Sequence, residues 1–381
     1  MQPLGINAGN ITIYPSVTGA AFFDDNVFAR NTNREGDWAF VLRPELAWRS
    51  NNWANAQFAG AGFVEKRWYR KFASEDQFNA GATVGGTVQP DANTQLVGRL
   101  SFLHSHEDRG TSDSIGAPTF SRPLEFNQLE AAGAINKRFD RVWTSLGAAA
   151  AFIHFRDPTL STGSVVSQAY RNGDIIRVPA RLGYVVAPLT SVFVEASGNR
   201  RNFRDDTFDS RGYRVVGGML WEPGPGSRIR GEAFAGYMRQ SYNGAAMLPV
   251  STWTYGAALA LLVAPRVTAV VEGRRDAKEA SPSGGTVAGD GVSVVETLAS
   301  ARVDFAVLPN FVIGGGASYL EDVYLGLGRT DRSISPLASA KWFVNRHLTL
   351  GFDYRHLRFD TAGTTSDYFK NVYLFSAHAR Y

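Results

Sequence analysis

The strongest constraint on the fold is a two-residue alternation of apolar and polar side chains that continues to the last residue. In the segment that ends the chain, the apolar positions are Tyr373, Phe375, Ala377, Ala379 and Tyr381, and the polar positions between them include Ser376, His378 and Arg380. This period places the two sets on opposite faces of a β-strand. Soluble domains usually end in a frayed tail, so a regular strand at the terminus indicates the closing strand of a membrane barrel.

Clusters of Gly, Pro, Asn and Asp divide the chain into about eighteen amphipathic segments. The connections between the segments alternate in length. Short connections fall at residues 51–52, 90–93, 140–141, 188–190, 223–226, 264–266, 308–310 and 345–346. Long connections fall at residues 24–36, 69–75, 107–123, 157–164, 205–209, 242–249, 276–290, 321–330 and 360–365. Alternation of this kind is typical of barrels with tight periplasmic turns and longer extracellular loops.

These patterns predict an all-β protein with a single transmembrane antiparallel up-and-down β-barrel of about 18 strands. Residues 1–10 are expected to form an N-terminal periplasmic tail and residues 11–381 the barrel. An even number of strands places both termini on the short-turn, periplasmic side. We expect residues 373–381 to pair with residues 11–22, because closure removes sheet edges that lipid would not tolerate.

Composition excludes several other classes of protein. No apolar run approaches the roughly 20 residues of a membrane-spanning helix. The chain has no Cys, which excludes disulfides, thiolate metal sites and a cysteine nucleophile. The net charge of +4 is too small for nucleic-acid binding. The first residues lack the basic and apolar segments of a signal peptide, so we expect a mature form from which that peptide was removed.

Tryptophan lies at segment ends, which predicts two aromatic girdles at the membrane interfaces. The alternative is that Trp caps the edges of a soluble core. The predicted girdle residues are Trp38, Trp48, Trp68, Trp143, Trp221, Trp253, Trp342 and Tyr381, with Trp53 at a short turn.

Ionisable residues collect on the inward parity, often as an acid and an Arg two positions apart. The predicted lumen-lining residues are Arg43, Glu45, Glu65, Arg67, Arg99, Glu130, Arg177, Arg181, Glu195, Arg230, Glu232, Glu272, Arg274, Glu296, Arg302, Asp353 and Arg355, with Asp304 beside them. Such pairs can simply order a wet wall, or they can bind a hydrated solute weakly. Lys66 is the exception: it shares the outward parity and is expected to snorkel to the interface.

Catalysis, cofactors and a metal site are not expected. His104 and His106 could hold a metal only with a third ligand, and their position beside the loop at 107–123 favours a place at the rim. The common hydrolase and phosphate-binding motifs are absent. A serine hydrolase with widely separated residues stays a distant alternative.

The sequence Ile13-Tyr14-Pro15-Ser16-Val17, followed by Phe23-Asp24-Asp25-Asn26-Val27, resembles the start of the putative beta-barrel porin 2 family. The turn sequences at 187–192 and 264–269 are similar to periplasmic turns of that family. The resemblance implies one barrel in the outer membrane of Gram-negative bacteria. For some members it implies a role in capsule or exopolysaccharide export with a periplasmic polysaccharide export protein. Asp24, Asp25 and Asn26 would open the first long loop, where they shape a turn or bind a cation.

We therefore expect an outer-membrane channel for a hydrated solute, and we favour an exported polysaccharide as that solute. A general diffusion porin for small solutes and a closed structural or adhesive barrel are the alternatives. The expected partners are outer-membrane lipid and lipopolysaccharide, the solute or polysaccharide itself, and no nucleic acid.

Overall fold

The protein is an antiparallel barrel of long strands. The computed structural model describes residues 3–51, 53–110, 120–245, 247–280, 292–362 and 367–381. In those residues the strands are β1 (Ile6–Ala8), β2 (Ile11–Asp24), β3 (Asp37–Ser50), β4 (Ala56–Tyr69), β5 (Gln77–Asp91), β6 (Thr94–Glu107), β7 (Leu124–Phe139), β8 (Val142–Phe155), β9 (Gly173–Ala187), β10 (Thr190–Phe203), β11 (Ser210–Trp221), β12 (Ile229–Tyr242), β13 (Val250–Ala264), β14 (Val267–Ala280), β15 (Val292–Leu308), β16 (Phe311–Tyr324), β17 (Arg329–Phe343), β18 (Leu348–Ala362) and β19 (Tyr368–Arg380).

Three short 3-10 helices lie in the loops of the described chain: η1 (Ala73–Glu75), η3 (Ala169–Arg171) and η4 (Asp206–Phe208). Among the described residues, no helix has the length and apolarity needed to cross a membrane.

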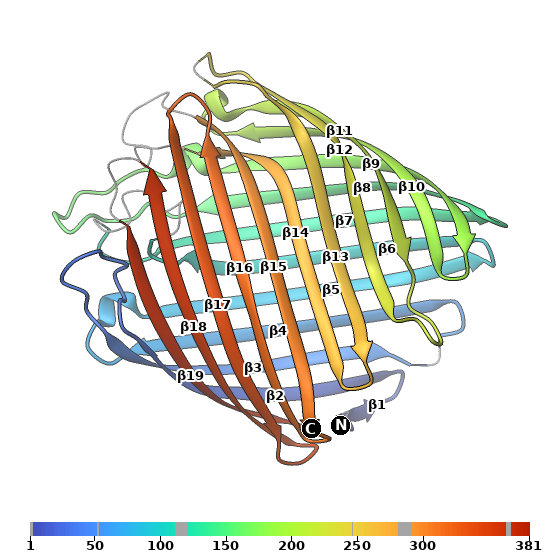
Figure 1. Cartoon of the computed structure of the whole chain (residues 1–381), viewed down its shortest axis with the longest axis horizontal. Helices are drawn as coiled ribbons and strands as arrows, with labels where there is room; N and C mark the ends of the chain where they lie inside the picture. Colours follow the sequence, from blue (N-terminus) through green and yellow to red (C-terminus); the bar gives the residue numbers. More distant parts are fainter. Residues whose placement is uncertain (1–2, 52, 111–119, 246, 281–291, 363–366) are drawn as a thin grey trace.

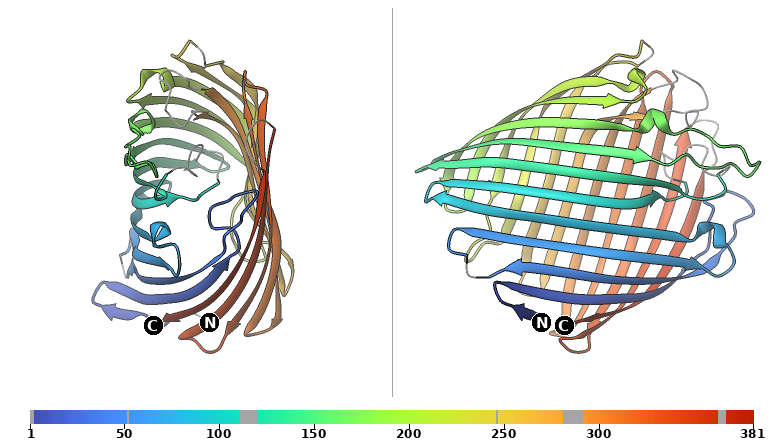
Figure 2. Two further views of the ribbon diagram at one scale, coloured as in Figure 1. Left: turned by 90° about the vertical axis from the view of Figure 1, so that its left-hand side faces the viewer. Right: turned by 180° about the vertical axis from the view of Figure 1, so that it is seen from behind.

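The sheet is closed. From β2 to β19 each strand pairs with the next one in sequence, and β19 returns to pair with β2 from Val372 opposite Asp24 to Arg380 opposite Ser16. The predicted barrel of 18 strands and its predicted closing pair are confirmed. The strands of the two walls cross steeply in Figures 1 and 2, because strands in a closed barrel tilt from its axis.

The N-terminal segment is more ordered than a free tail. Residues 6–8 form β1, which pairs antiparallel with the start of β2, so the barrel carries one extra strand outside the closed ring. The amide of Gly5 also donates to the carbonyl of Tyr381 at 3.4 Å. Both termini therefore lie together at the end of the barrel that has the short turns (Figure 1).

Connection lengths follow the predicted alternation with two corrections. β14 continues to Ala280 and β16 to Tyr324, so strand occupies part of the loops expected at 276–290 and 321–330. Only residues 325–328 join β16 to β17. Gly326 and Gly328 have φ values of +87° and +63°, which L-residues with a Cβ rarely adopt. A tight turn replaces the expected long loop here.

The two faces of the strands differ as the alternation predicts. On β10, Val192 and Val194 are exposed, whereas Phe193 and Glu195, which alternate with them, are buried. On β19, Phe375 is exposed and the His378 ring bonds to the Thr18 hydroxyl at 2.9 Å on the inner wall. Large apolar side chains thus cover the outside, which only a lipid environment removes from water.

Candidate functional site

The densest polar cluster of the inner wall surrounds Glu195. Its carboxylate is 1% exposed and accepts hydrogen bonds from Arg177 at 2.7 Å, Arg181 at 2.5 Å and Arg214 at 2.7 Å. Arg181 also donates to Glu232 at 2.7 Å. Three guanidinium groups share two carboxylates, so this part of the wall carries an excess of positive charge.

The structure brings strands β9 to β12 together to form this cluster. Glu195 lies directly opposite Arg181 on β9 and Val216 on β11 in the strand register. The guanidinium of Arg214 also lies over the Phe234 ring, 4.9 Å from its centroid. Arg214 was missed by the sequence analysis, although its parity, opposite to that of the exposed Tyr213, was a sufficient signal.

A second polar cluster lies on β3 and β4. Arg43 contacts Glu45 at 3.3 Å and Glu65 at 3.6 Å, and Arg67 contacts Glu65 at 3.7 Å. The Arg43 and Glu45 side chains are more than a third exposed, so solvent screens their attraction and the pair adds little stability. The cluster instead supplies hydrated charge of both signs to the lumen.

A third group of charges spans β14 to β18. Arg302 pairs with Asp304 at 2.8 Å and donates to the Ser339 hydroxyl at 2.7 Å. Arg274 pairs with Glu296 on the neighbouring strand at 2.9 Å. A Cβ at Gly314 would lie 2.2 Å from the Asp304 carboxylate, so this glycine makes room for the pair.

The remaining predicted lining residues share the inward face but not the predicted partners. Arg99 donates to Ser101, and Glu130 accepts from Gln128. Among the described residues, no ion pair joins the predicted partners Arg230 with Glu232, Glu272 with Arg274, or Asp353 with Arg355. Glu232 pairs with Arg181 and Arg274 with Glu296 instead. Arg274 and Glu296 lie on neighbouring strands, whereas Arg181 reaches Glu232 from β9 past β10 and β11, so the arrangement of the strands in space decides these pairings.

The predicted girdle residues lie on the outer face with one exception. The exposed members are Trp38, Trp68, Trp253, Trp342 and Tyr381. Trp48 and Trp221 are partly covered and share the outward parity of their strands. Whether this belt meets an interface stays a prediction. Lys66 lies among them, opposite Leu42 and Phe78.

Trp143 corrects the girdle prediction. It lies opposite Gly183, which lies opposite the buried Phe193, and the Trp143 and Phe193 rings are 6.4 Å apart on the inner wall. A Cβ at Gly183 would lie 2.1 Å from the indole, so the glycine provides the space that the ring occupies. The parity of β8 was the signal: Leu146 and Phe152 are exposed and Trp143 has the opposite parity.

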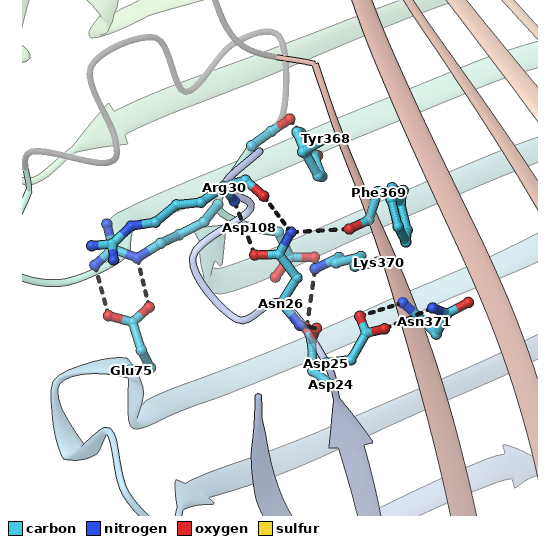
Figure 3. Close-up of polar contacts among 12 residues, drawn as sticks. Asp24, Asp25, Asn26, Arg30, Glu75, Asp108, Tyr368, Phe369, Lys370 and Asn371 are labelled. Carbon is cyan, nitrogen blue, oxygen red and sulfur yellow. Dashed lines mark hydrogen bonds and ion pairs between the residues drawn. The ribbon is translucent and has the colours of Figure 1, made fainter. Parts of the chain in front are cut away.

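Residues 108–110, which follow β6, contact the inner face of β19 at the long-loop end. The hydroxyl of Tyr368 on β19 donates to the carbonyl of Gly110 at 2.7 Å. Beside it, Arg109 makes two bonds of 2.7 Å to Glu75, and both side chains are at most 4% exposed. Figure 3 shows Asp108 and Glu75 close to Tyr368 and Lys370 of β19 and to the first long loop. The fixed contacts narrow the mouth from one side.

The Asp24-Asp25-Asn26 sequence shapes the first long loop. Asp24 accepts from the Asn26 amide at 2.9 Å and from the Lys370 ammonium at 3.2 Å. Asp25 accepts two bonds of 2.7 Å from Asn371. Asn26 is fully buried and bonds to the carbonyls of Arg30 and Phe369 (Figure 3). These contacts describe a turn tied to β19, which favours the turn role over a cation site.

The hairpin of β14 and β15 narrows the mouth from the other side. Pairing between β13 and β14 begins only at Gly256 opposite Arg274, and beyond that point the end of β14 lies inside β12 and β13. Ala277 packs with Met238, Val250 and Val295 in a buried cluster. The outward face of this strand end is therefore covered by the inward face of the wall.

A polar contact holds the same hairpin end. Arg201 on β10 donates to the Ala277 carbonyl at 3.0 Å and to Glu279 at 2.8 Å. The Ser210 hydroxyl also donates to Glu279, at 3.1 Å. On the other side, Lys278 pairs with the buried Asp322 at 2.9 Å. The hairpin end is thus anchored to β10 and β11 on one side and to β16, the next strand of its own sheet, on the other.

Cavities line the inner wall between the two ends of the barrel. One of about 1650 Å³ lies near the short turns and includes Thr12, Arg49 and Arg99 in its lining. Another, of about 530 Å³, lies against the Glu195 cluster and is also lined by Arg274 and Asp276. The inner wall is thus concave next to its charged groups.

The histidines at 104 and 106 have separate partners. The His104 ring bonds to Asn127 at 2.9 Å, and the His106 ring bonds to Asn79 at 2.9 Å and to Asp108 at 3.3 Å. Within the described chain, no group of three or more His, Cys, Asp or Glu residues could hold a metal ion. The hydrogen bond from His106 lowers the pKa of Asp108, in the loop, well below its usual range.

Comparisons with known proteins agree with the family resemblance. The model of the family described as putative beta-barrel porin 2 matches residues 1–381. Among solved structures, OccK3 (OpdO) of Pseudomonas aeruginosa is 14% identical, with 97% of this chain and 96% of that chain covered and a TM-score of 0.48. OccAB4 of Acinetobacter baumannii is 10% identical, with 98% and 99% covered and a TM-score of 0.49.

A BenF-like porin of Pseudomonas fluorescens Pf-5 is 11% identical, with 97% of this chain and 99% of that chain covered and a TM-score of 0.48. No curated protein matches the chain.

Proposed function

We propose that this chain, which belongs to the putative beta-barrel porin 2 family, is a diffusion channel for small hydrated solutes. The family and the closed barrel make it a porin-like channel of the outer membrane. We propose two things beyond this: that the solute is small, and that the short turns of the barrel face the periplasm.

The narrowing at the long-loop end carries this proposal. Tyr368 holds the loop at Gly110 on one side, and Arg201 holds the hairpin at Glu279 on the other. Both contacts lie inside the wall: the first ties the residues after β6 to β19, and the second ties the end of β14 to β10. A mouth into which two anchored segments reach favours solutes of a few carbons over a polymer chain. The charged lining favours hydrated solutes. An apolar solute would displace water from the charged side chains and leave them without hydrogen-bond partners, which costs free energy.

The excess of Arg around Glu195 supports a moderate preference for anions. Arg177, Arg181 and Arg214 share two carboxylates, so the wall there attracts negative charge. Elsewhere the lumen carries charges of both signs. The preference for anions should therefore be weaker than in a channel with a complete ring of positive side chains.

Polysaccharide export with a periplasmic export protein rested on the family resemblance alone. No contact among the described residues favours it over diffusion. A deletion strain separates the two functions: slower uptake of small solutes supports diffusion, and loss of secreted polysaccharide contradicts it.

Purified protein in planar bilayers tests the channel itself. We expect discrete conductance steps and swelling of proteoliposomes in small neutral or anionic solutes, with a steep loss as solute size grows. Silence in both assays would leave a closed structural barrel as the better account. Liposome swelling in long oligosaccharides as fast as in monosaccharides would contradict the proposed size class.

We further propose that both termini, which lie at the short-turn end, face the periplasm, as expected for barrels of this kind. An epitope inserted after Gly163, in the loop between β8 and β9, should bind antibody on intact cells. An epitope at the C-terminus should bind only after the outer membrane is opened.

A further inference from the structure

Three arginines on the outer face of the barrel lie together near the long-loop end. Arg200 on β10 lies directly opposite Arg211 on β11, and Tyr213, two residues further, lies opposite Arg239 on β12. All three arginine side chains are exposed. We call Arg200, Arg211 and Arg239 the outer arginine cluster.

The parity of these strands places the cluster outside the barrel. Arg200 has the same parity as the exposed Val192 and Val194, opposite to the buried Glu195. Tyr213 and Tyr237 are exposed on the same face as Arg211 and Arg239. The cluster is therefore separate from the lumen and from any path through it.

Like charge directly across a strand pair is unfavourable, and no acid of the described residues lies within ion-pair distance of this cluster. Side chains directly opposite have Cβ atoms about 5 Å apart, and diagonal neighbours about 7–8 Å. Among the described residues, none of the three arginines forms an ion pair. Arg200 donates a hydrogen bond to Asn202 at 2.6 Å. Asn202 in turn donates one of 2.9 Å to Asp174, the nearby acid on the outward face.

The opposite wall shows how the same barrel otherwise treats outward charge. On β16 to β18, Arg332 contacts Glu321 at 2.8 Å and Arg358 contacts Asp360 at 3.0 Å. The outer arginine cluster on β10 to β12 has no such acidic partner among the described residues. An anion from outside the chain would therefore balance its charge.

The depth of the cluster indicates which anion. Just below it on the same face lie Tyr213, Tyr237 and the 69% exposed Trp253, whose ring makes an edge contact with Tyr237. Exposed aromatic rings of this kind mark the boundary between acyl chains and headgroups. Arginine side chains directly above that boundary reach the level of lipid phosphates, which guanidinium groups bind through paired hydrogen bonds.

We propose that the outer arginine cluster binds the phosphate groups of a phosphorylated glycolipid in the outer leaflet. The orientation of the barrel proposed above places the cluster in that leaflet. Binding would remove the repulsion between Arg200 and Arg211 and fix a lipid against β10 to β12.

Titration of the purified barrel in non-ionic detergent with diphosphoryl lipid A tests this site. Replacing the cluster in the triple variant R200Q/R211Q/R239Q should weaken lipid A binding by about tenfold or more, because charge-assisted hydrogen bonds are lost. The wild type should bind lipid A without its phosphates no more tightly than the triple variant binds diphosphoryl lipid A. High salt should weaken wild-type binding, because it screens exposed charges.

The matched control is R156Q/R332Q/R358Q, which removes three exposed arginines that each already pair with an acid: Arg156 with Glu125 at 2.7 Å, Arg332 with Glu321 and Arg358 with Asp360. It should keep wild-type affinity within about twofold, since these arginines already have partners. An equal loss in both variants, or no loss in the cluster variant, would overturn the proposal. Displacement of lipid A by inorganic phosphate alone, or equally tight binding of phosphatidylglycerol, would overturn the assignment to a phosphorylated glycolipid.

Two further readouts keep the test independent of the channel. Without lipid, the cluster variant should unfold at no lower temperature than the wild type, because a repulsion has been removed. Its single-channel conductance should be unchanged, because the cluster lies outside the lumen. If a preparation lost conductance but still bound lipid A, the result would contradict the proposed channel and leave the proposed lipid site standing.

Discussion

The hydroxyl of Tyr368 donates a 2.7 Å hydrogen bond to the carbonyl of Gly110, which joins the last strand to the residues after β6 at the mouth of the barrel. The two residues are 258 positions apart in the chain. Gly110 has a φ of +81°, and a Cβ there would lie 2.5 Å from the Tyr368 hydroxyl. This close approach is part of what narrows the lumen.

Removing that hydroxyl should loosen the mouth. We expect Tyr368→Phe to raise single-channel conductance or its fluctuation, because the loop loses an anchor of about 1 kcal/mol. Planar bilayer recordings measure this. Tyr373→Phe changes a hydroxyl on the lipid-facing side and should leave conductance as in the wild type. Identical recordings for all three proteins would show that the loop does not limit the pore.

The hairpin on the other side gives a parallel prediction. Glu279→Gln weakens the charged contacts to Arg201, and the end of β14 should move more freely. We expect a larger mean conductance and faster entry of small sugars in liposome swelling. Glu272→Gln, on the same strand, lacks these contacts and serves as the control. A smaller conductance in Glu279→Gln would contradict the assigned role of the hairpin.

Glu195 should matter for both stability and ion preference. Glu195→Gln leaves Arg177, Arg181 and Arg214 with less compensation, and we expect a loss of about 2 kcal/mol in the free energy of unfolding. The reversal potential in a salt gradient should shift towards anions. Loss of the folded form on heating measures the first effect. Unchanged anion preference would mean that the permeating ion does not pass this cluster.

Fluorescence quenching can distinguish inward from outward tryptophans. Brominated lipids should quench Trp253, which is exposed on the outer face, and should not reach Trp143, which lies against Phe193 inside. The variant Trp253→Phe should therefore lose more quenchable signal than Trp143→Phe. The opposite order would place the indole of Trp143 in the lipid.

Acid should affect the loop at Asp108 only at very low pH in the wild type. Its pKa is depressed by the His106 hydrogen bond, so the charged form and its contacts persist until the pH falls through that lowered value. In His106→Ala the pKa should return towards about 4, and the contacts should be lost there. Conductance recorded from neutral to acid pH should show an inflection near that value in the variant alone. The same inflection in the wild type would exclude the role given to His106.

Much of the fold was predictable because its determinants are local. The alternation through Tyr373 and Phe375, the turn residues at 188–190 and the parity of Arg43 and Glu45 each depend on a few neighbouring residues. Side-chain direction in a strand changes with every residue, so period and turn chemistry specify strands, faces and connection order. The closing pair of β19 with β2 then follows from the need to remove edges.

Partners across strands needed the three-dimensional structure. The two-residue spacing in the sequence places Arg230 beside Glu232, but Arg181, three strands away on β9, pairs with that carboxylate. Trp143 lies at the end of its strand, as expected, but its side chain is on the inner face of the barrel, where it cannot belong to a girdle. These choices depend on which strand lies next to which position, and no local pattern contains that information.

The same holds for the mouth. Nothing near Ala277 in the sequence indicates that this strand end lies inside β12 and β13, or that Tyr368 reaches Gly110. The sequence by itself determined a closed barrel with a charged interior and apolar exterior. Only the tertiary structure decided how far that interior stays open and where unpaired positive charge gathers outside, because both result from contacts between segments that are distant in the chain.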